Sequence, residues 1–594
     1  MAKSIYTNVP RLLVDLIKDV RSGRIGLPDL QRPFVWKDSK VRDLFDSMIK
    51  GFPIGYIMLW ESPTDYDDKK TSIGVEDKAY KAPKDLVIDG QQRLTALVAS
   101  MYGVTVVDSK FDKRRIRIAF KPQTKEFEVW TPAIEKSAEY ISDLSEIFLA
   151  KENNTYTKLR KEFIKRLNDS LSKREAPLLT SEEEDKIEEN INELLNLENY
   201  QIPSLEISYN SSEEDVADIF VRVNSAGQKL TENDFILTLI SVYEKERRDQ
   251  IDNFCADSRI PADKTSYNHI LNVEPSHIVR MTVAIGFRRA RLRYAYMILR
   301  GKDLETGITS LENREENLSK FKEALDKVVH LNDWHGFLNI IKEAGYVSDK
   351  LVVSSNAIVF SYVIYLIAKH DFHMDSFRLR KLIRKWFFMA AVTSFYTGNA
   401  ESDVEKQFAD IRDFKTMDEF DTYLNRVIDA RFTDDYFRIT LPMALETSAA
   451  NSPAWCGYLA SQIVLGYPML FSTAPLSSVF SAGSSGLKNA VDKHHIFPKN
   501  YLAKIDIPND RDRNQIANFT YLDYSTNIHI SDREPLDYAL EYQSKLKDEE
   551  YQKTCAQHAL PEKFYEMNYF DFLKERRILM AQIVKRAYER LCNS

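Results

Sequence analysis

The hydrophobic pattern changes along the chain, and this change constrains the fold more than any other feature. Before about residue 235, short alternating stretches such as RRIRIAFKP and EFEVW predict strands among helices. From Asp234 to Ala450, long amphipathic stretches such as ENLSKFKEALDKVVHL predict helices alone. Because a single core stops growing at about 300 residues, a chain of 594 residues is expected to form several domains. We therefore predict a helix-rich, multidomain α+β protein with domains at 1–235, 236–450 and 451–594.

Composition narrows the class of protein. With 44% hydrophobic and 29% charged residues, the chain reads as an ordinary globular protein. The longest apolar run, Ala357–Ala368, is shorter than the about 20 residues that cross a bilayer, so it predicts a buried helix and no membrane partner. The N-terminus lacks the order of a signal peptide, and the cysteines are scattered, which fits a reducing cytoplasm. The net charge of −7 still allows a local basic groove for nucleic acid.

Two further segments have an interpretation from composition. The stretch Ser472–Ala490, rich in Ser, Ala and Gly, predicts a linker or loop. Arginines, lysines and aromatic residues interleave in Arg378–Met389, and this pattern favours a buried apolar stripe with a solvated basic face over a DNA-binding helix.

A strand, a tight turn and a helix meet at the sequence DGQQR, Asp89 to Arg93. Gly90 allows the turn, and the start of the helix exposes backbone N–H groups that suit phosphate. Arg93 adds a planar cation, Asp89 could hold a metal or activate water, and Gln91 and Gln92 can donate to phosphate or base. A structural turn held by an Asp–Arg pair is the alternative interpretation.

Near the C-terminus, the pair His494-His495 is the strongest sign of chemistry. Phosphodiester hydrolysis needs a base for water and a cation for the charge on the phosphate. Adjacent histidines on a strand point to opposite faces, so one can bind a metal while the other faces a substrate. Asn518 and Asn527 follow, and a strand-to-helix return could bring Asn527 back to the metal. A purely structural histidine pair is the alternative.

The segment Val491–Tyr538, with HHIFPK, IANFTYL and STNIHIS, resembles the ββα-metal (HNH) endonucleases. The resemblance implies that His494 binds the metal and that His495 is the general base. It also implies that Asn518 orients this base through the backbone and that Asn527 is the second ligand. His529 and Asp492 remain alternative ligands. The metal implied is Mg²⁺ or Mn²⁺, although this ligand set also suits another transition metal.

The N-terminal motifs LPDLQRPFVW, DGQQR and IFVRVNSAGQKLTENDF together resemble the GmrS-type domain, which is related to the ParB and sulfiredoxin fold. In this family the DGQQR turn binds and hydrolyses a nucleoside triphosphate, and Arg222 and Asn224 are the implied further phosphate contacts. The preceding loop is implied in sensing modified DNA, with the residues Gln31, Arg32, Pro33, Phe34 and Trp36. Phe34 and Trp36 could instead belong to the core. The chain has no Walker-type P-loop.

Together the two ends resemble the GmrSD-type fused enzymes of anti-phage defence, of the BrxU and SspE kind. The resemblance implies an NTP-regulated, modification-dependent DNA endonuclease whose helical middle couples the two ends. Its expected partners are modified phage DNA and an NTP, with GTP, ATP, UTP and CTP all open, and a homodimer would help to make double-strand breaks. Two alternatives remain: an NTP-regulated DNA-binding or sensing protein with an inactive HNH module, and a nuclease whose DGQQR turn is structural.

Overall fold

The structure is a computed structural model, and it divides into two compact units, Met1–Asp249 and Gln250–Ser594, each of which is treated by itself. Its described residues are 6–28, 34–61, 70–71, 85–108, 112–208, 219, 236–237, 240, 245–261, 263–299, 301–303, 306, 310–480 and 491–593. The predicted loop residues 481–490 lie outside these ranges. No helix among the described residues is long and apolar enough to cross a membrane.

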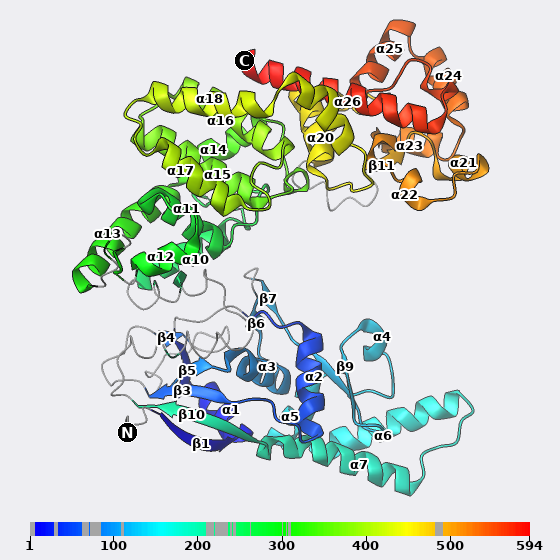
Figure 1. The fold of residues 1–594 in the computed structure, drawn as a ribbon. Coiled ribbons are helices and arrows are strands. Elements are labelled where there is room, and N and C mark those ends of the chain that lie inside the picture. The colour runs from blue at the N-terminus through cyan, green and yellow to red at the C-terminus, as the bar shows by residue number, and fades with distance from the viewer. Residues whose placement is uncertain are drawn as a thin grey trace. The chain divides into compact units, whose positions relative to one another are not determined.

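A mixed sheet organises the first unit (Figure 1). Within the described residues its strand order is β1-β10-β3-β5-β2-β4. These strands are β1 Tyr6–Leu12, β2 Ile25–Pro28, β3 Ile57–Glu61, β4 Lys70–Thr71, β5 Asp85–Asp89 and β10 Gln201–Ile207. β10 runs parallel to β3, and β5 runs parallel to β2, whereas the other neighbours are antiparallel. Short pairs elsewhere in the unit are β6 Val106–Val107 with β7 Lys113–Arg114, and β8 Ile118–Lys121 with β9 Glu126–Val129.

Side chains along a strand alternate between the two faces of the sheet, and helices pack against one of these faces. Ile57, Leu59 and Val87 join the main core with α1 Leu13–Arg21, α2 Asp38–Ile49 and α3 Gln91–Tyr102. Met58 and Ile88 point to the opposite face and form a smaller apolar cluster. The remaining helices of the unit are α4 Pro132–Glu135, α5 Leu144–Glu152, α6 Tyr156–Lys173, α7 Ser181–Leu195 and the short 3₁₀ turn η1 Asn196–Asn199.

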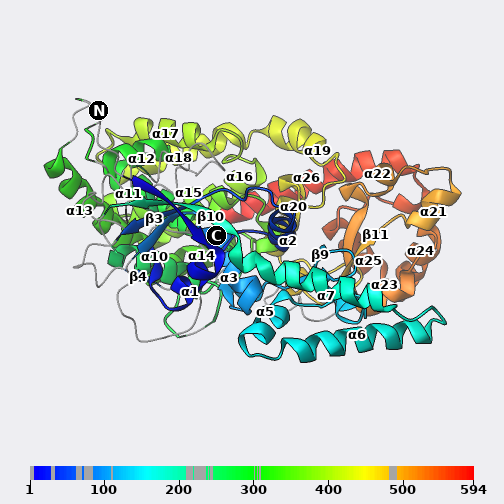
Figure 2. The ribbon, with the colours of Figure 1, turned by 90° about the horizontal axis from the view of Figure 1, so that it is seen from below.

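Figures 1 and 2 both show α6 and α7 side by side. An ion pair between Arg160 and Glu188 joins the two helices, and Asn168 donates to Glu184 at 3.3 Å. Thr180 begins α7 with a capping box that uses Glu183. The acidic run SEEEDKIEEN therefore lies on a helix that is paired with a partly basic one.

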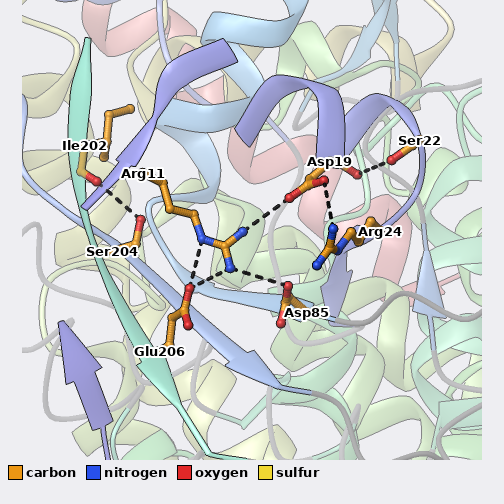
Figure 3. A network of polar contacts seen from close by, with 8 residues as sticks. All are labelled: Arg11, Asp19, Ser22, Arg24, Asp85, Ile202, Ser204 and Glu206. Atoms are coloured by element: carbon orange, nitrogen blue, oxygen red, sulfur yellow. Dashed lines mark hydrogen bonds and ion pairs between the residues drawn. The ribbon is translucent and has the colours of Figure 1, made fainter. Parts of the chain in front are cut away.

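Arg11 connects the first strand, β1, to β10, α1 and β5, as Figure 3 shows. Arg11 on β1 donates to Glu206 Oε1 on β10 from Nη2 at 2.6 Å and from Nε at 2.9 Å. Its other terminal nitrogen, Nη1, lies 3.3 Å from Asp19 on α1, and Nη2 lies 3.8 Å from Asp85 at the start of β5. Both donors meet one oxygen of Glu206, and this contact joins β1 to β10 near the start of β5.

The second unit is mostly helical within its described residues, and α10 begins before the boundary. Its helices before the C-terminal segment are α10 Lys245–Asp257, α11 Pro275–Phe287, α12 Leu292–Leu299, α13 Leu311–Val328, α14 Leu331–Glu343, α15 Ser355–Leu366, α16 Ser376–Val392, α17 Ala400–Ile411, α18 Met417–Arg431, α19 Leu441–Ala444 and α20 Pro453–Leu465. Shorter turns are η2 Asp349–Leu351, η3 Ile367–Asp371, η4 Tyr436–Thr440 and η5 Leu476–Phe480. The run Ala357–Ala368 is buried in α15 and the following turn, as predicted.

The C-terminal segment contains a ββα arrangement. Strand β11 Val491–His495 pairs antiparallel with β12 Phe519–Asp523, and α23 Tyr524–Ile530 follows β12 directly. Around it lie α21 Lys499–Lys504, α22 Asp510–Arg513, η7 Ile516–Asn518, α24 Pro535–Lys545, α25 Asp548–Gln557 and η8 Phe564–Glu566. The last helix, α26 Tyr569–Asn593, packs against both α16 and α20.

These elements confirm a helix-rich α+β protein with small sheets. The helices predicted for 236–450 and the segment 451–594 share one unit, because α26 folds back across both. Arg384 on α16 donates to the backbone of Leu591 at 3.0 Å, and the fully buried Arg576 donates to the carbonyl of Ala517 at 2.6 Å. A sequence pattern cannot show such a return, because each contact joins residues far apart in the chain.

Candidate functional site

His494 and His495 end β11, and their rings leave the strand on opposite faces. Nδ1 of His494 lies 2.9 Å from Oδ1 of Asn527 on α23, whereas Nε2 of His495 lies 3.1 Å from Oδ1 of Asn514. In the strand register, His494 stands opposite Thr520 and His495 opposite Phe519. The alternation of strand side chains thus gives the two histidines separate surroundings, as the sequence predicts.

His494 is 7% exposed, and its surroundings favour a neutral imidazole. Burial lowers the pKa of His494 to about 4, and the hydrogen bond with Asn527 opposes this shift only in part. Because Asn527 Oδ1 is an acceptor, Nδ1 of His494 carries the proton and Nε2 carries a lone pair. Nε2 is buried and has no hydrogen-bond partner among the described residues. A neutral imidazole nitrogen of this kind is a common metal ligand.

The other sequence-predicted ligands differ in their surroundings. His529 lies two residues after Asn527, and residues two apart on a helix do not face each other. Its Nε2 is 2.6 Å from Glu541 Oε1, and Arg533 donates to the other oxygen of this carboxylate at 2.6 Å. The side chain of Asp492 lies outside the described residues. Among the described residues, no group of three or more His, Cys, Asp and Glu could hold a metal ion.

Asn518 is fully buried and uses its whole amide to bind backbone. Its Oδ1 accepts from the N–H of Phe497 at 2.8 Å, and its Nδ2 donates to Phe497 O at 3.0 Å and to Arg513 O at 3.2 Å. Its own carbonyl accepts from the N–H of Ile496 at 2.8 Å. Asn518 therefore fixes the chain immediately after His495.

His495 shares one face of β11 with a lysine that sequence reasoning missed. The His495 ring meets the Phe519 ring edge-on at 4.8 Å between centroids, and Nζ of Lys493 lies 4.0 Å from the centre of the Phe519 ring. Burial lowers the pKa of His495, and the charges of Lys499 and Lys493 lower it further, while the hydrogen bond with Asn514 opposes the shift. The signal for Lys493 was available, because residues two apart on a strand share a face.

The DGQQR turn has the strand–turn–helix form that the sequence predicts. β5 ends at Asp89, Gly90 has a φ of 90°, and α3 begins at Gln91. The φ of 90° disfavours any residue with a side chain, and a Cβ at position 90 would also lie in tight contact, 3.1 Å from the carbonyl oxygen of Tyr56. The start of α3 therefore stands directly beside the start of β3.

Arg93 is directed toward the backbone at the start of β3. Its Nη1 donates to the carbonyl of Tyr56 at 2.5 Å, and a Cβ at Gly55 would lie 2.8 Å from its Nη2. Burial lowers the pKa of Arg93, and the charge of Asp89 opposes this shift. Tyr56 in turn forms a side-chain hydrogen bond with Asp89. Burial raises the pKa of Tyr56, and the charge of Asp89 and this hydrogen bond raise it further. Sequence reasoning missed Gly55 and Tyr56.

The predicted DNA-sensing loop is described only in its second half. Gln92 Oε1 accepts from the N–H of Val35 at 2.8 Å, which ties this loop to the DGQQR turn. Phe34 is 4% exposed and belongs to the main core, whereas Trp36 is half-buried, with Nζ of Lys40 lying 4.3 Å from its ring centre. The predicted site residues outside the described ranges are Gln31, Arg32, Pro33, Arg222 and Asn224.

Comparison with known proteins agrees with the N-terminal motifs. An uncharacterized protein of Methanocaldococcus jannaschii is 24% identical over 556 residues, which cover 89% of this chain and 86% of the relative. Residues 13–241 match the family described as the GmrSD restriction endonuclease N-terminal domain. This match contains all three of the motifs QRPFVW, DGQQR and NSAG. The N-terminal region of the chain is therefore of the GmrSD restriction endonuclease type.

Proposed function

We propose that the protein is an NTP-regulated, modification-dependent DNA endonuclease of anti-phage defence, with its nuclease site in the ββα arrangement. The GmrSD match of residues 13–241 supports a restriction endonuclease. The observation that carries the nuclease site is the pair of unlike histidines at the end of β11. His494 is buried with an unpartnered nitrogen, and His495 is half-buried beside two lysines.

The residues present fit a divalent cation. Nε2 of His494 offers a buried lone pair, and Asn527 on α23 places an amide oxygen beside the same ring, 2.9 Å from Nδ1. Mg²⁺ usually keeps several waters and binds substrate phosphates as well, so few of its ligands need to come from the protein. His494 and Asn527 would hold Mg²⁺ or Mn²⁺, and Asn527 is preferred to His529 because His529 is engaged by Glu541. When bound, the cation stabilises charge on the phosphate and on the leaving oxygen.

His495 supplies the base in this proposal. Its neutral ring takes a proton from water while the water oxygen forms a bond to phosphorus and the P–O bond to the leaving strand breaks. The leaving oxygen then takes a proton from solvent. Lys493 lies on the same strand face and supplies a cation for the phosphate oxygens.

The DGQQR turn is the proposed nucleotide site. Its helix start provides N–H groups for phosphate, and Asp89, Gln91 and Gln92 are the polar side chains beside it. Arg93 already binds the backbone of Tyr56. In this proposal it stabilises the turn, and its positive charge attracts the phosphates without a direct hydrogen bond. The bond between Gln92 and Val35 offers a direct link from the nucleotide site to the loop proposed to sense modified DNA, where the half-buried Trp36 is the aromatic candidate.

Cleavage of matched DNAs tests the proposal. Plasmids that are unmodified, glucosylated at hydroxymethylcytosine or phosphorothioated are incubated with Mg²⁺ or Mn²⁺, with and without each NTP. The wild type is expected to cut one modified DNA in an NTP-dependent way, and His495→Ala is expected to abolish cutting while retaining DNA binding. Equal cutting by both proteins would overturn the base assignment. Modification-specific binding without cutting by the wild type would favour the sensing protein with an inactive nuclease module.

Phosphate release tests the nucleotide site separately. Asp89→Ala is expected to abolish NTP turnover, and Asp108→Ala, in the same unit but outside the turn, is its control. Unchanged turnover in Asp89→Ala would instead favour a nuclease whose DGQQR turn is structural.

A further inference from the structure

His495 is held through only one of its ring nitrogens. Nε2 lies 3.1 Å from Oδ1 of Asn514, and an amide oxygen can only accept, so Nε2 carries the proton. Nδ1 therefore carries the lone pair. Nδ1 makes no hydrogen bond to any described residue, and it is not among the buried polar atoms without partners, so solvent can reach it. The nitrogen that is free to accept a proton is thus the accessible one.

The turn that carries Asn514 is anchored from two directions. Asn514 follows α22, and its N–H donates to Asp510 O at 3.0 Å. Tyr569 of α26 donates its hydroxyl to Asp512 O at 2.8 Å, and Asn518 donates to Arg513 O at 3.2 Å. These bonds fix the backbone that immediately precedes Asn514, and this limits the positions that its short side chain can take.

One buried side chain fixes both partners of the contact. Asn518 binds Phe497, two residues after His495, and also Arg513, one residue before Asn514. The two segments that carry the His495–Asn514 bond are therefore joined by the same amide. Orientation of a histidine by a hydrogen bond to its second nitrogen sets which nitrogen can accept a proton.

We infer that Asn514 is the positioning residue of His495, which selects the Nε2–H tautomer and directs Nδ1 toward the reacting water. The inference rests on the proposed function, because it assigns a partner to the proposed base. Asn514 acts through His495 and does not touch the reacting atoms. An amide oxygen at this place also stabilises the ring once it has taken up a proton, because Nε2–H remains a donor to it.

A matched pair of variants separates the hydrogen bond from simple packing. Asn514→Asp keeps an acceptor oxygen at the same place, whereas Asn514→Leu has a similar shape and no acceptor. Asn514→Leu is expected to lower kcat for DNA cleavage by about 10- to 100-fold with little change in KM, by analogy with the loss found for groups that orient metal-binding histidines. Asn514→Asp is expected to restore most of the rate. Asn509→Ala, which removes a cap of the same short helix without touching His495, is the control and is expected to cut nearly as the wild type.

A direct reading of the tautomer makes the test independent of cleavage. In the full chain with ¹⁵N-labelled histidine at neutral pH, the His495 signal, assigned by its loss in His495→Ala, is expected to show a protonated Nε2. Asn514→Leu is expected to show a mixture of both tautomers, and Asn514→Ala replaces it if the leucine variant does not fold. An unchanged tautomer or unchanged kcat in a folded Asn514 variant lacking the acceptor overturns the inference. If His495→Ala still cuts DNA, the proposed function fails, whereas the tautomer result still decides the role of Asn514.

Discussion

Nδ1 of His494 and Oδ1 of Asn527 lie 2.9 Å apart, although 33 residues separate them in the chain. The contact joins the end of β11 to the middle of α23, and it exists because β12 returns the chain antiparallel to β11 before the helix begins. It closes the ββα arrangement at its polar centre. The proposed metal site needs both residues, so this pair is the first target for mutation.

Asn527→Ala is expected to weaken Mn²⁺ binding and to lower cleavage by at least about 10-fold, since it removes one of the two proposed ligands. His529→Ala is the matched control on the same helix, and it should change both quantities little because its ring is bound by Glu541. Mn²⁺ titration followed by electron paramagnetic resonance measures the binding. The reverse ranking, with His529→Ala the weaker binder, would make His529 the ligand.

Asn518→Ala is expected to destabilise the second unit by about 2–5 kcal/mol, because it leaves buried backbone groups of Phe497 and Arg513 without partners. Urea unfolding of the full chain measures this loss. The surface variant Asn500→Ala, which loses only an exposed bond to Asp532, should stay near the wild-type value. Equal stability of the two variants would show that the Asn518 amide is dispensable.

Gly90→Ala is expected to destabilise the first unit and to reduce NTP turnover, because a Cβ there would lie 3.1 Å from Tyr56 O at a φ of 90°. The expected loss in unfolding free energy is about 1–3 kcal/mol. Gly51→Ala separates strain from contact, since Gly51 has a φ of 72° and nothing within 4 Å of its Cβ position. If Gly90→Ala behaves as Gly51→Ala does in urea unfolding, the Tyr56 contact has no energetic weight.

His558 predicts a loss of stability in mild acid. It is buried between Thr520 and Pro468, with its Nε2–H donated to Pro468 O at 2.9 Å, and burial lowers its pKa to about 4. The unfolded chain binds a proton at this residue below pH about 6.5, whereas the folded chain does so only near pH 4. The free energy of unfolding should therefore fall as the pH drops through this window, by up to about 1.4 kcal/mol per pH unit.

Urea midpoints between pH 7 and pH 5 check this prediction. His558→Gln, which keeps a donor and an acceptor but does not titrate, should show a smaller loss than the wild type. An identical loss in both proteins would assign the acid sensitivity to other groups.

Lys493→Gln is expected to weaken DNA binding and to reduce the salt dependence of the binding constant by about one unit of slope, as loss of one phosphate contact does. Lys553→Gln, on the exposed face of α25, should leave this slope unchanged. Fluorescence anisotropy at several salt concentrations gives both slopes. A slope for Lys493→Gln equal to that of the wild type would remove Lys493 from the phosphate contacts.

The sequence alone determined the elements that local patterns control. The length of a continuous apolar run predicted the buried helix at Ala357–Ala368, and the order of strand, glycine and helix predicted the turn at Asp89–Arg93. The alternation of a strand predicted that His494 and His495 face different surroundings. Each of these features depends on residues within one or two turns of the backbone.

Only the tertiary structure decided which distant groups meet. It paired His494 with Asn527, gave His529 to Glu541, turned Arg93 onto Tyr56 and placed Asn514 at His495. It also brought α26 across the helices that precede the ββα arrangement, in one unit. These contacts depend on how strands and helices pack after long loops, and no period in the sequence encodes the distance between two side chains on different elements.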